Sequence, residues 1–205
     1  MQQIIKESLD NSINYADYCR LMHKLVLDKF TTGDDISEAN INYTMLNEAR
    51  MSRWNKKLEI AESEKAIIKG FSTEVIWLVI TESWCGDAAH LLPVINKVAE
   101  LNTNINMRIV LRDDNENLMN LFLTNGSKSV PKLIMLDARS LKVLGVYGPR
   151  PSAATKMVDD YKHIHGSLTP EFKEALQRWY NKDKGQTAIK DLTKFLKKQT
   201  PSFYL

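Results

Sequence analysis

One segment, residues 75–94, constrains the fold more than any other part of the chain. It opens with an unbroken run of apolar residues from Val75 to Ile80. A run of that length and composition is typical of a strand that is covered on both faces of its sheet. From Leu91 onward, apolar residues recur at steps of three and four, which predicts a helix from about Gly86 to Leu101. The segment therefore predicts a buried strand that leads directly into an amphipathic helix.

A cysteine, Cys85, lies at the junction between this strand and this helix. The first N–H groups of a helix have no partners within the helix, and the helix dipole places partial positive charge there. Both effects favour the thiolate, which is the nucleophilic form of cysteine. The position of Cys85 therefore favours a reactive thiolate.

The residues around and after Cys85 resemble the thioredoxin superfamily. The shared features are Trp84-Cys85-Gly86 after an apolar strand, Pro93 in the next helix, Val130-Pro131 before another apolar strand, and Gly148. Pro131 follows Cys85 by 46 residues, about the span that the superfamily uses. The resemblance covers roughly residues 70–165 and implies an α/β thioredoxin-like fold, with a central mixed sheet flanked by helices. The motif Trp-Cys-Gly-Asp-Ala-Ala, together with Tyr147-Gly148-Pro149-Arg150-Pro151, looks like a branch with a single active-site cysteine.

The resemblance also implies which residues surround the cysteine. Trp84 would shield one flank of the sulfur. Pro131, with a cis peptide bond, would lie beside the sulfur and leave the Val130 backbone free to pair with an extended substrate. Gly148 would close the third side, because its missing side chain allows another backbone to approach. The predicted site has Cys85 as nucleophile and a substrate groove of Trp84, Gly86, Asp87, Val130, Pro131, Gly148 and Arg150.

Two features of the thioredoxin pattern are missing. Thioredoxins carry a second cysteine, which resolves the mixed disulfide, at the position of Ala88. The buried acid that often assists proton transfer in the superfamily falls on Val79, which is apolar. A mixed disulfide on Cys85 would therefore need an external thiol to resolve it.

Asp87 and Arg150 carry the charges nearest to the predicted site. The Asp87 carboxylate supports the first helical turn through the dipole, but its charge opposes thiolate formation at Cys85. Arg150 would offset that charge if the Gly-Pro-Arg-Pro turn brings its guanidinium to the groove. The sequence leaves the net shift open, and a surface arginine between two prolines is an equally good interpretation of Arg150.

Composition and charge narrow the classes of function. A chain of 205 residues with 43% hydrophobic content suits one ordinary domain with extensions. The net charge of +3, without a basic face interleaved with aromatic residues, does not favour a nucleic-acid partner. No segment approaches membrane-spanning length, and the N-terminus lacks a secretory signal pattern. Two cysteines in a chain of this length suit a reducing compartment, so we expect a cytoplasmic protein.

Helical periodicity on both sides of the thioredoxin-like segment predicts three regions. Residues 1–69 form a helical N-terminal extension, with apolar stripes over residues 4–30 and 40–65 and a short run ended by Gly70. Residues 70–165 form the thioredoxin-like domain, with further strands at 105–111, 132–136 and 141–147 and helices at 116–123 and 151–163. Residues 166–205 form a helical C-terminal extension, with an apolar stripe of Phe172, Leu176 and Trp179 after Pro170 and a last helix at 187–199. The extensions offer a surface for a dimer.

Cys19 and His90 are further candidates for chemistry. Cys19 lies in the first predicted helix, where a small buried side chain is a better interpretation than a remote resolving thiol. His90 follows Cys85 by five residues and points away from the sulfur, so it suits a polar edge of the helix better than a base. The histidines and cysteines have no spacing typical of a metal site, and no cofactor is expected.

Three functions remain open from the sequence. The first is thiol–disulfide exchange through Cys85, with protein or small-molecule thiols and disulfides as partners. The second is a redox-inactive thioredoxin-fold binding or interaction module, which the residues Ala88 and Val79 favour. The third, ligation of a metal or cluster by Cys85 from two protomers together with a small thiol, depends on one protein ligand per chain. We expect the first.

Overall fold

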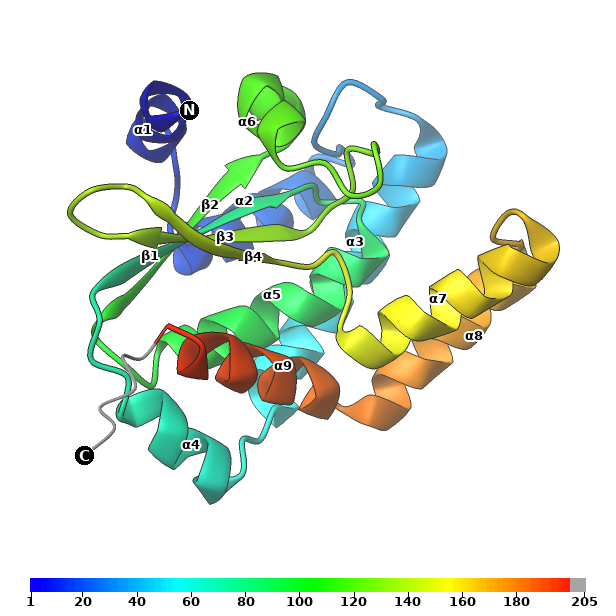
Figure 1. Cartoon of the computed structure of the whole chain (residues 1–205). Helices are drawn as coiled ribbons and strands as arrows, with labels where there is room; N and C mark the ends of the chain where they lie inside the picture. The colour runs from blue at the N-terminus through cyan, green and yellow to red at the C-terminus, as the bar shows by residue number, and fades with distance from the viewer. Residues whose placement is uncertain (200–205) are drawn as a thin grey trace.

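The structure is a computed structural model that describes residues 1–199, and it contains a central mixed sheet with helices on both faces (Figure 1). The strands are β1 (Val75–Thr81), β2 (Ile105–Leu111), β3 (Lys132–Asp137) and β4 (Val143–Tyr147), in the order β2-β1-β3-β4. β1 pairs in parallel with β2 and antiparallel with β3, and β3 pairs antiparallel with β4. The predicted α/β class, with a mixed sheet flanked by helices, is confirmed.

β1 lies inside the sheet and is buried on both faces, as its continuous apolar run predicts. Trp77, Leu78, Val79 and Ile80 are fully buried. Burial of one such side chain contributes about 1.5–3 kcal/mol to folding, so the strand is a rigid support for whatever follows it. Its carboxyl end leads directly to Cys85.

The helix α5 (Gly86–Ala99) follows β1 and lies on one side of the sheet with α9 (Gln186–Lys197). The predicted helix start at Gly86 is confirmed, and Pro93 lies inside the helix. On the other side of the sheet lie α1 (Gln2–Asp10) and α6 (Glu116–Leu121), the latter preceded by a short 3₁₀ helix at Asp113–Asn115 (Figure 1). The sheet is therefore the middle of three layers.

The N-terminal helical stripes are each broken once, which the sequence did not predict. The stripe over residues 4–30 is split into α1 and α2 (Tyr15–Leu27), and that over 40–65 into α3 (Glu38–Lys57) and α4 (Glu62–Lys69). Between α1 and α2, Ile13 forms an antiparallel bridge with Ile109 of β2, and the Asn14 side chain caps α2. A contact with a distant strand thus interrupts a pattern that would otherwise continue as a helix.

The helices α7 (Ser152–His165) and α8 (Pro170–Asp183) form a hairpin that projects away from the sheet (Figure 1). The predicted start at Pro170 is confirmed, with the Thr169 side chain as its cap. The residues of the predicted apolar stripe pack in one cluster, in which Phe172 and Leu176 are buried and Trp179 is partly buried; Tyr180 is a further buried member that the sequence did not predict. The reason is that steps of four residues bring Tyr180 onto the face that meets α7.

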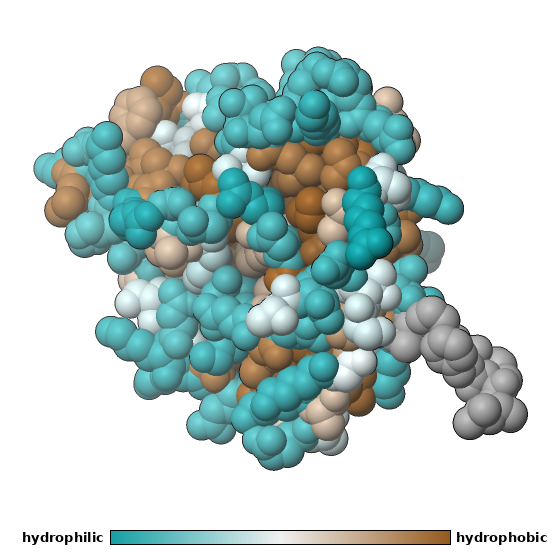
Figure 2. Space-filling view, turned by 90° about the vertical axis from the view of Figure 1, so that its left-hand side faces the viewer, coloured by the Kyte–Doolittle hydropathy of each residue, from teal (hydrophilic) through white to brown (hydrophobic). Residues whose placement is uncertain are grey.

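Figure 2 shows the side of the molecule opposite to this hairpin, where hydrophobic residues form separate patches between hydrophilic ones. Within residues 1–199, no helix has both the length and the apolar character that a membrane span requires. The predicted C-terminal extension runs to residue 205, and its last six residues lie outside the described part of the chain.

Candidate functional site

Cys85 is the N-cap residue of α5, and residues 82–84 separate it from the end of β1 at Thr81. Its backbone N–H donates to the Glu82 carbonyl oxygen, and its carbonyl oxygen accepts from the Ala89 N–H, both at 3.2 Å. The thiol donates to the carbonyl oxygen of Val130 at 3.2 Å. Only 8% of the residue is exposed. The sulfur therefore lies at the start of the helix, as predicted, but turns inward against the loop before β3.

The loop before β3 and the loop after β4 meet next to this contact. The Val130–Pro131 peptide bond is cis. Gly148 has a φ of +101°, and a Cβ atom there would lie 2.5 Å from the carbonyl oxygen of Pro131. Glycine alone combines this conformation with so close an approach of two backbones. The structure thus brings Cys85, Val130, Pro131 and Gly148 together.

Asp87, Arg150 and Tyr180 form a polar cluster on the first turn of α5. Nη2 of Arg150 lies 2.7 Å from Oδ2 of Asp87, and the Tyr180 hydroxyl donates to Oδ1 of the same carboxylate at 2.7 Å. The sequence leaves two interpretations of Arg150 open, and in the structure its guanidinium forms the ion pair with Asp87. Burial raises the pKa of Asp87, and the charge of Arg150 and the hydrogen bond from Tyr180 oppose that rise.

The structure gives a direction to the pKa shift of Cys85, which the sequence leaves open. Burial, followed by the charge of Asp87, raises the pKa of Cys85 to about 12. The backbone N–H groups of Ala88 and Asp87 and the charge of Arg150 lower the pKa as expected, but by less. Burial destabilises the thiolate because it removes water that would solvate the charge, and the N–H groups at the start of the helix compensate for only part of that loss. In this conformation Cys85 is therefore a protonated thiol at neutral pH.

The other two predicted groove residues, Trp84 and Gly86, flank Cys85 in the sequence. Trp84 is partly buried, and the guanidinium of Arg112 lies 4.9 Å from the centroid of its ring. A Cβ atom at Gly86 would lie 3.4 Å from the side-chain nitrogen of Gln177 on α8. Trp84 thus keeps some exposure, whereas α8 lies directly against Gly86.

His90 connects α5 with α3 and α8. Its Nδ1 accepts from Nε1 of Trp54 at 2.8 Å, so its Nε2 carries the proton and donates to the Gln177 side-chain oxygen at 2.9 Å. Its ring stacks on that of Tyr180, with centroids 4.3 Å apart. Burial lowers the pKa of His90 to about 4. The sequence placed His90 at a polar edge of the helix; it is instead buried, because both ring nitrogens have partners there.

A buried acid, Glu82, lies three residues before Cys85 and was not singled out from the sequence. Its carboxylate accepts from the backbone N–H of Asp113 at 3.0 Å and from the hydroxyl of Thr32. Burial raises the pKa of Glu82. An acid placed directly after a buried strand was the available signal, whereas the thioredoxin pattern has its buried acid at the position of Val79.

Gln177 and Tyr180 are further site residues that sequence reasoning missed. Both belong to the C-terminal helical region, and they contact His90 and Asp87 across more than eighty positions of the chain. No local sequence pattern predicts a contact between residues so far apart in the chain. The four-residue steps from Phe172 to Tyr180 predict a helix face, but they do not show what the face covers.

Cys19 lies on α2, away from the residues grouped around Cys85. It is half-buried, and the side-chain nitrogen of Asn55 donates to its sulfur at 4.0 Å. Both Cys19 and Cys85 are free, and burial raises the pKa of Cys19 as well. Within the described residues, no group of three or more His, Cys, Asp and Glu side chains is placed to hold a metal ion.

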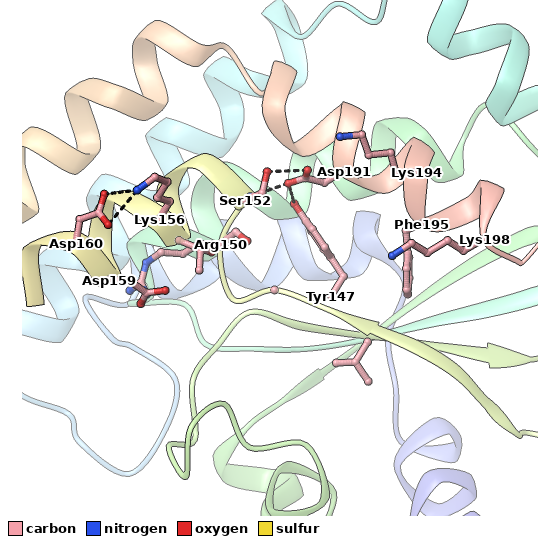
Figure 3. A pocket seen from close by; sticks show the side chains of 13 residues that line it. Tyr147, Arg150, Ser152, Lys156, Asp159, Asp160, Asp191, Lys194, Phe195 and Lys198 are labelled. Carbon is pink, nitrogen blue, oxygen red and sulfur yellow. Dashed lines mark hydrogen bonds and ion pairs between the residues drawn. The ribbon is translucent and has the colours of Figure 1, made fainter. Parts of the chain in front are cut away.

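A hollow of about 690 Å³ opens beside β4, between α7 and α9 (Figure 3). Gly148 and Arg150 line it, together with lysines and aspartates of both helices, and Cys85 is not among the described residues of its wall. Asp191 accepts from the backbone N–H of Ser152 at 2.7 Å and from its hydroxyl at 2.8 Å, which joins the start of α7 to α9 (Figure 3). The hollow therefore lies next to the residues around Cys85, and its wall carries both positively and negatively charged side chains.

We expect Asp87→Asn to make Cys85 more reactive. The substitution removes the carboxylate charge that raises the pKa of the thiol, while Arg150, which lowers that pKa, remains. One pKa unit changes the thiolate fraction about tenfold below the pKa. In a Cys19→Ser background, alkylation by iodoacetamide at pH 8 should accelerate by about tenfold, and the whole rate–pH profile should move to lower pH. Asp160→Asn, at an exposed ion pair with Lys156, should leave the profile where it is.

Comparison with known proteins places this arrangement in a family. A thioredoxin family model matches residues 33–162, which is more than half of the chain. The chain belongs to the thioredoxin family. The match starts before α3, so the family sequence pattern includes α3 and α4 as well as the sheet.

Two solved structures share the thioredoxin-like fold of this chain. One is a protein of unknown function from Pseudomonas aeruginosa, with a TM-score of 0.65 and 18% sequence identity over 95% of this chain and 98% of that one. The other is an HIV epitope-scaffold, with a TM-score of 0.58 and 18% identity over 92% of this chain and 100% of that one. At this identity the likeness concerns the fold alone. No curated protein is significantly similar in sequence.

Proposed function

We propose that this thioredoxin-family chain carries out thiol–disulfide exchange through a single nucleophile, Cys85. The observation that supports it best is the position of the sulfur at the start of α5, 3.2 Å from the Val130 carbonyl oxygen. That carbonyl belongs to the backbone with which an extended substrate would pair in the predicted groove. A disulfide held there would lie next to the sulfur.

The exchange takes two steps. Cys85, once deprotonated, attacks one sulfur of a disulfide R–S–S–R′; a new S–S bond joins Cys85 to R, and R′ leaves as a thiolate that takes up the proton. An external thiolate R″–S⁻ then attacks the sulfur of R, which forms R–S–S–R″ and releases the Cys85 thiolate. The external thiol is needed because Ala88 stands where a resolving cysteine would be. The reaction consumes no other oxidant or reductant.

The partners of this reaction are protein or small-molecule thiols and disulfides. We propose a cytoplasmic setting, because both cysteines of the chain are free thiols, as in a reducing compartment. We also propose that the helical regions at residues 1–69 and 166–205 serve as extensions of the thioredoxin-like domain and as a surface for a dimer.

A redox-inactive binding module is the second candidate function, and the raised pKa of Cys85 favours it. In that function the loops at Pro131 and Gly148 would bind a partner without forming a covalent bond. The two functions differ in one measurable property, which is whether the Cys85 sulfur accepts another thiol.

Formation of a mixed disulfide is the test. The Cys19→Ser variant, treated with hydroxyethyl disulfide, should gain one adduct by mass spectrometry that dithiothreitol removes. The rate should still be rising with pH at pH 10, because the Cys85 pKa is raised to about 12. The Cys19→Ser/Cys85→Ser variant should gain no adduct. If the folded Cys19→Ser protein gains none even at pH 10, the exchange function is wrong and the binding module replaces it.

A further inference from the structure

The hairpin of α7 and α8 is built as a unit of its own. Its apolar side chains pack on one another in a cluster that is separate from the main core around the sheet. The buried members of this cluster are Ala154, Val158, Phe172, Leu176 and Tyr180. A segment with its own apolar cluster can move as one body without opening the main core. Figure 1 shows how far the hairpin projects from the sheet.

Side-chain hydrogen bonds join this hairpin to the helices beside Cys85. They are the pairs Tyr180 with Asp87, Gln177 with His90, and Asn181 with Arg53. Polar groups of this kind can exchange their partners for water when they are exposed, unlike buried apolar contacts. The attachment of α8 over the site, which also includes the stacking of Tyr180 on His90, therefore depends more on polar groups than the packing within the hairpin does.

The base of the hairpin holds its two ends in place. The start of α7 is tied to α9 by the two hydrogen bonds from Ser152 to Asp191. After α8, Lys184 and Gly185 both have left-handed backbone conformations, with φ of 55° and 76°. A Cβ atom at Gly185 would lie 2.9 Å from the side chain of Val94, so this turn packs closely against α5. A sharp turn that packs against another helix is a point about which α8 can tilt.

We propose that α8 is a cover over Cys85, which tilts away on the Lys184–Gly185 turn before the thiol can react. In the closed position Gln177 lies against Gly86, and Tyr180 holds the Asp87 carboxylate next to the cysteine. Tilting would bring water to the sulfur and relieve the burial that is the main cause of its raised pKa. The use of the cover rests on the proposed function, since it would control when Cys85 meets a disulfide.

Alkylation of Cys85 by iodoacetamide measures the cover without requiring any exchange reaction. In the full chain with Cys19→Ser, the further change Gln177→Ala removes one of the hydrogen bonds and touches no charge. We expect alkylation to be at least about fivefold faster at every pH, with an unchanged shape of the rate–pH profile, because the open fraction increases and the pKa of the open form does not change. Adding Tyr180→Phe, which keeps the ring in the hairpin cluster, should accelerate the reaction further.

Arg178→Ala is the matched control on the same helix. Arg178 is exposed and pairs with Glu174 on the outer side of α8. Its loss should leave the alkylation rate within about twofold of the parent, since exposed pairs of this kind contribute little. A comparable acceleration in Arg178→Ala would mean that general loosening of α8, and not its contacts with the site, sets the rate, and would overturn the proposal.

The urea dependence of the rate distinguishes tilting from unfolding. A local tilt exposes little surface, so the logarithm of the alkylation rate should rise with urea at a small fraction of the global unfolding slope. Rates unchanged by Gln177→Ala, or a slope equal to the global one, would overturn the cover. Faster alkylation without any adduct from hydroxyethyl disulfide would support the cover and reject the exchange function, so the two proposals can fail separately.

Discussion

Replacing Gly148 with alanine is expected to destabilise the protein by more than about 2 kcal/mol and to push apart the two loops that contain Pro131 and Gly148. The residue has a φ of +101°, and the added Cβ atom would meet the Pro131 carbonyl oxygen at 2.5 Å. Because this oxygen belongs to the backbone, the loop that contains Pro131 would have to move as a whole. Val130 lies in that loop and accepts the hydrogen bond from the Cys85 thiol, so the site should be disturbed together with the fold.

Gly126→Ala is the matched control for Gly148→Ala. Gly126 also has a positive φ, +75°, but no atom lies within 4 Å of the position of its Cβ. Its replacement should cost only the backbone strain, about 1–2 kcal/mol. Equilibrium urea unfolding of both variants measures the difference. Equal losses in the two variants would mean that the contact between the loops contributes nothing.

Ala88→Cys is expected to raise disulfide reductase activity by about two orders of magnitude. The new thiol would lie on the first turn of α5, close to Cys85, where it could attack a mixed disulfide from within the same molecule. Intramolecular attack replaces an encounter with a dilute external thiol, and effective concentrations of well-placed groups far exceed those of free thiols. Ala88 is buried and its N–H already faces the Cys85 sulfur, so the position is near enough.

Turnover of a protein disulfide with dithiothreitol as the final reductant measures this gain. Ala89→Cys is the control, because Ala89 is equally buried but lies on a different face of the helix. It should not increase turnover. If Ala88→Cys also fails to do so while the protein remains folded, the groove does not admit disulfides, and the binding module becomes the better account of the chain.

The core of the fold could be predicted because its signals are local. The six-residue apolar run of β1, the strand at 105–111 and the start of α5 at Gly86 each follow from neighbouring residues, and the structure has them in those places. The continuous helices expected over residues 4–30 and 40–65 were wrong for the opposite reason. Ile13 is not helical because it pairs with Ile109, almost a hundred residues away, and helical periodicity in the sequence carries no information about such a contact.

The candidate site likewise contains residues that the sequence predicts and residues that it does not. Cys85, Val130, Pro131 and Gly148 could be grouped from the resemblance to thioredoxins, and the structure brings them together. The partners of Asp87 and His90 on α8 could not be predicted, because α8 belongs to a region outside that resemblance. The cysteine whose net pKa shift the sequence leaves open is a buried thiol in the structure.

That a cysteine lies between a buried strand and a helix follows from the sequence, because neighbouring residues change from a continuous apolar run to a helical period. The charge state of that cysteine follows only from how the chain packs around it. Ionisation depends on the water and charges that surround the sulfur, and these are set by packing with Tyr180 and Arg150, which reach Asp87 from distant parts of the chain.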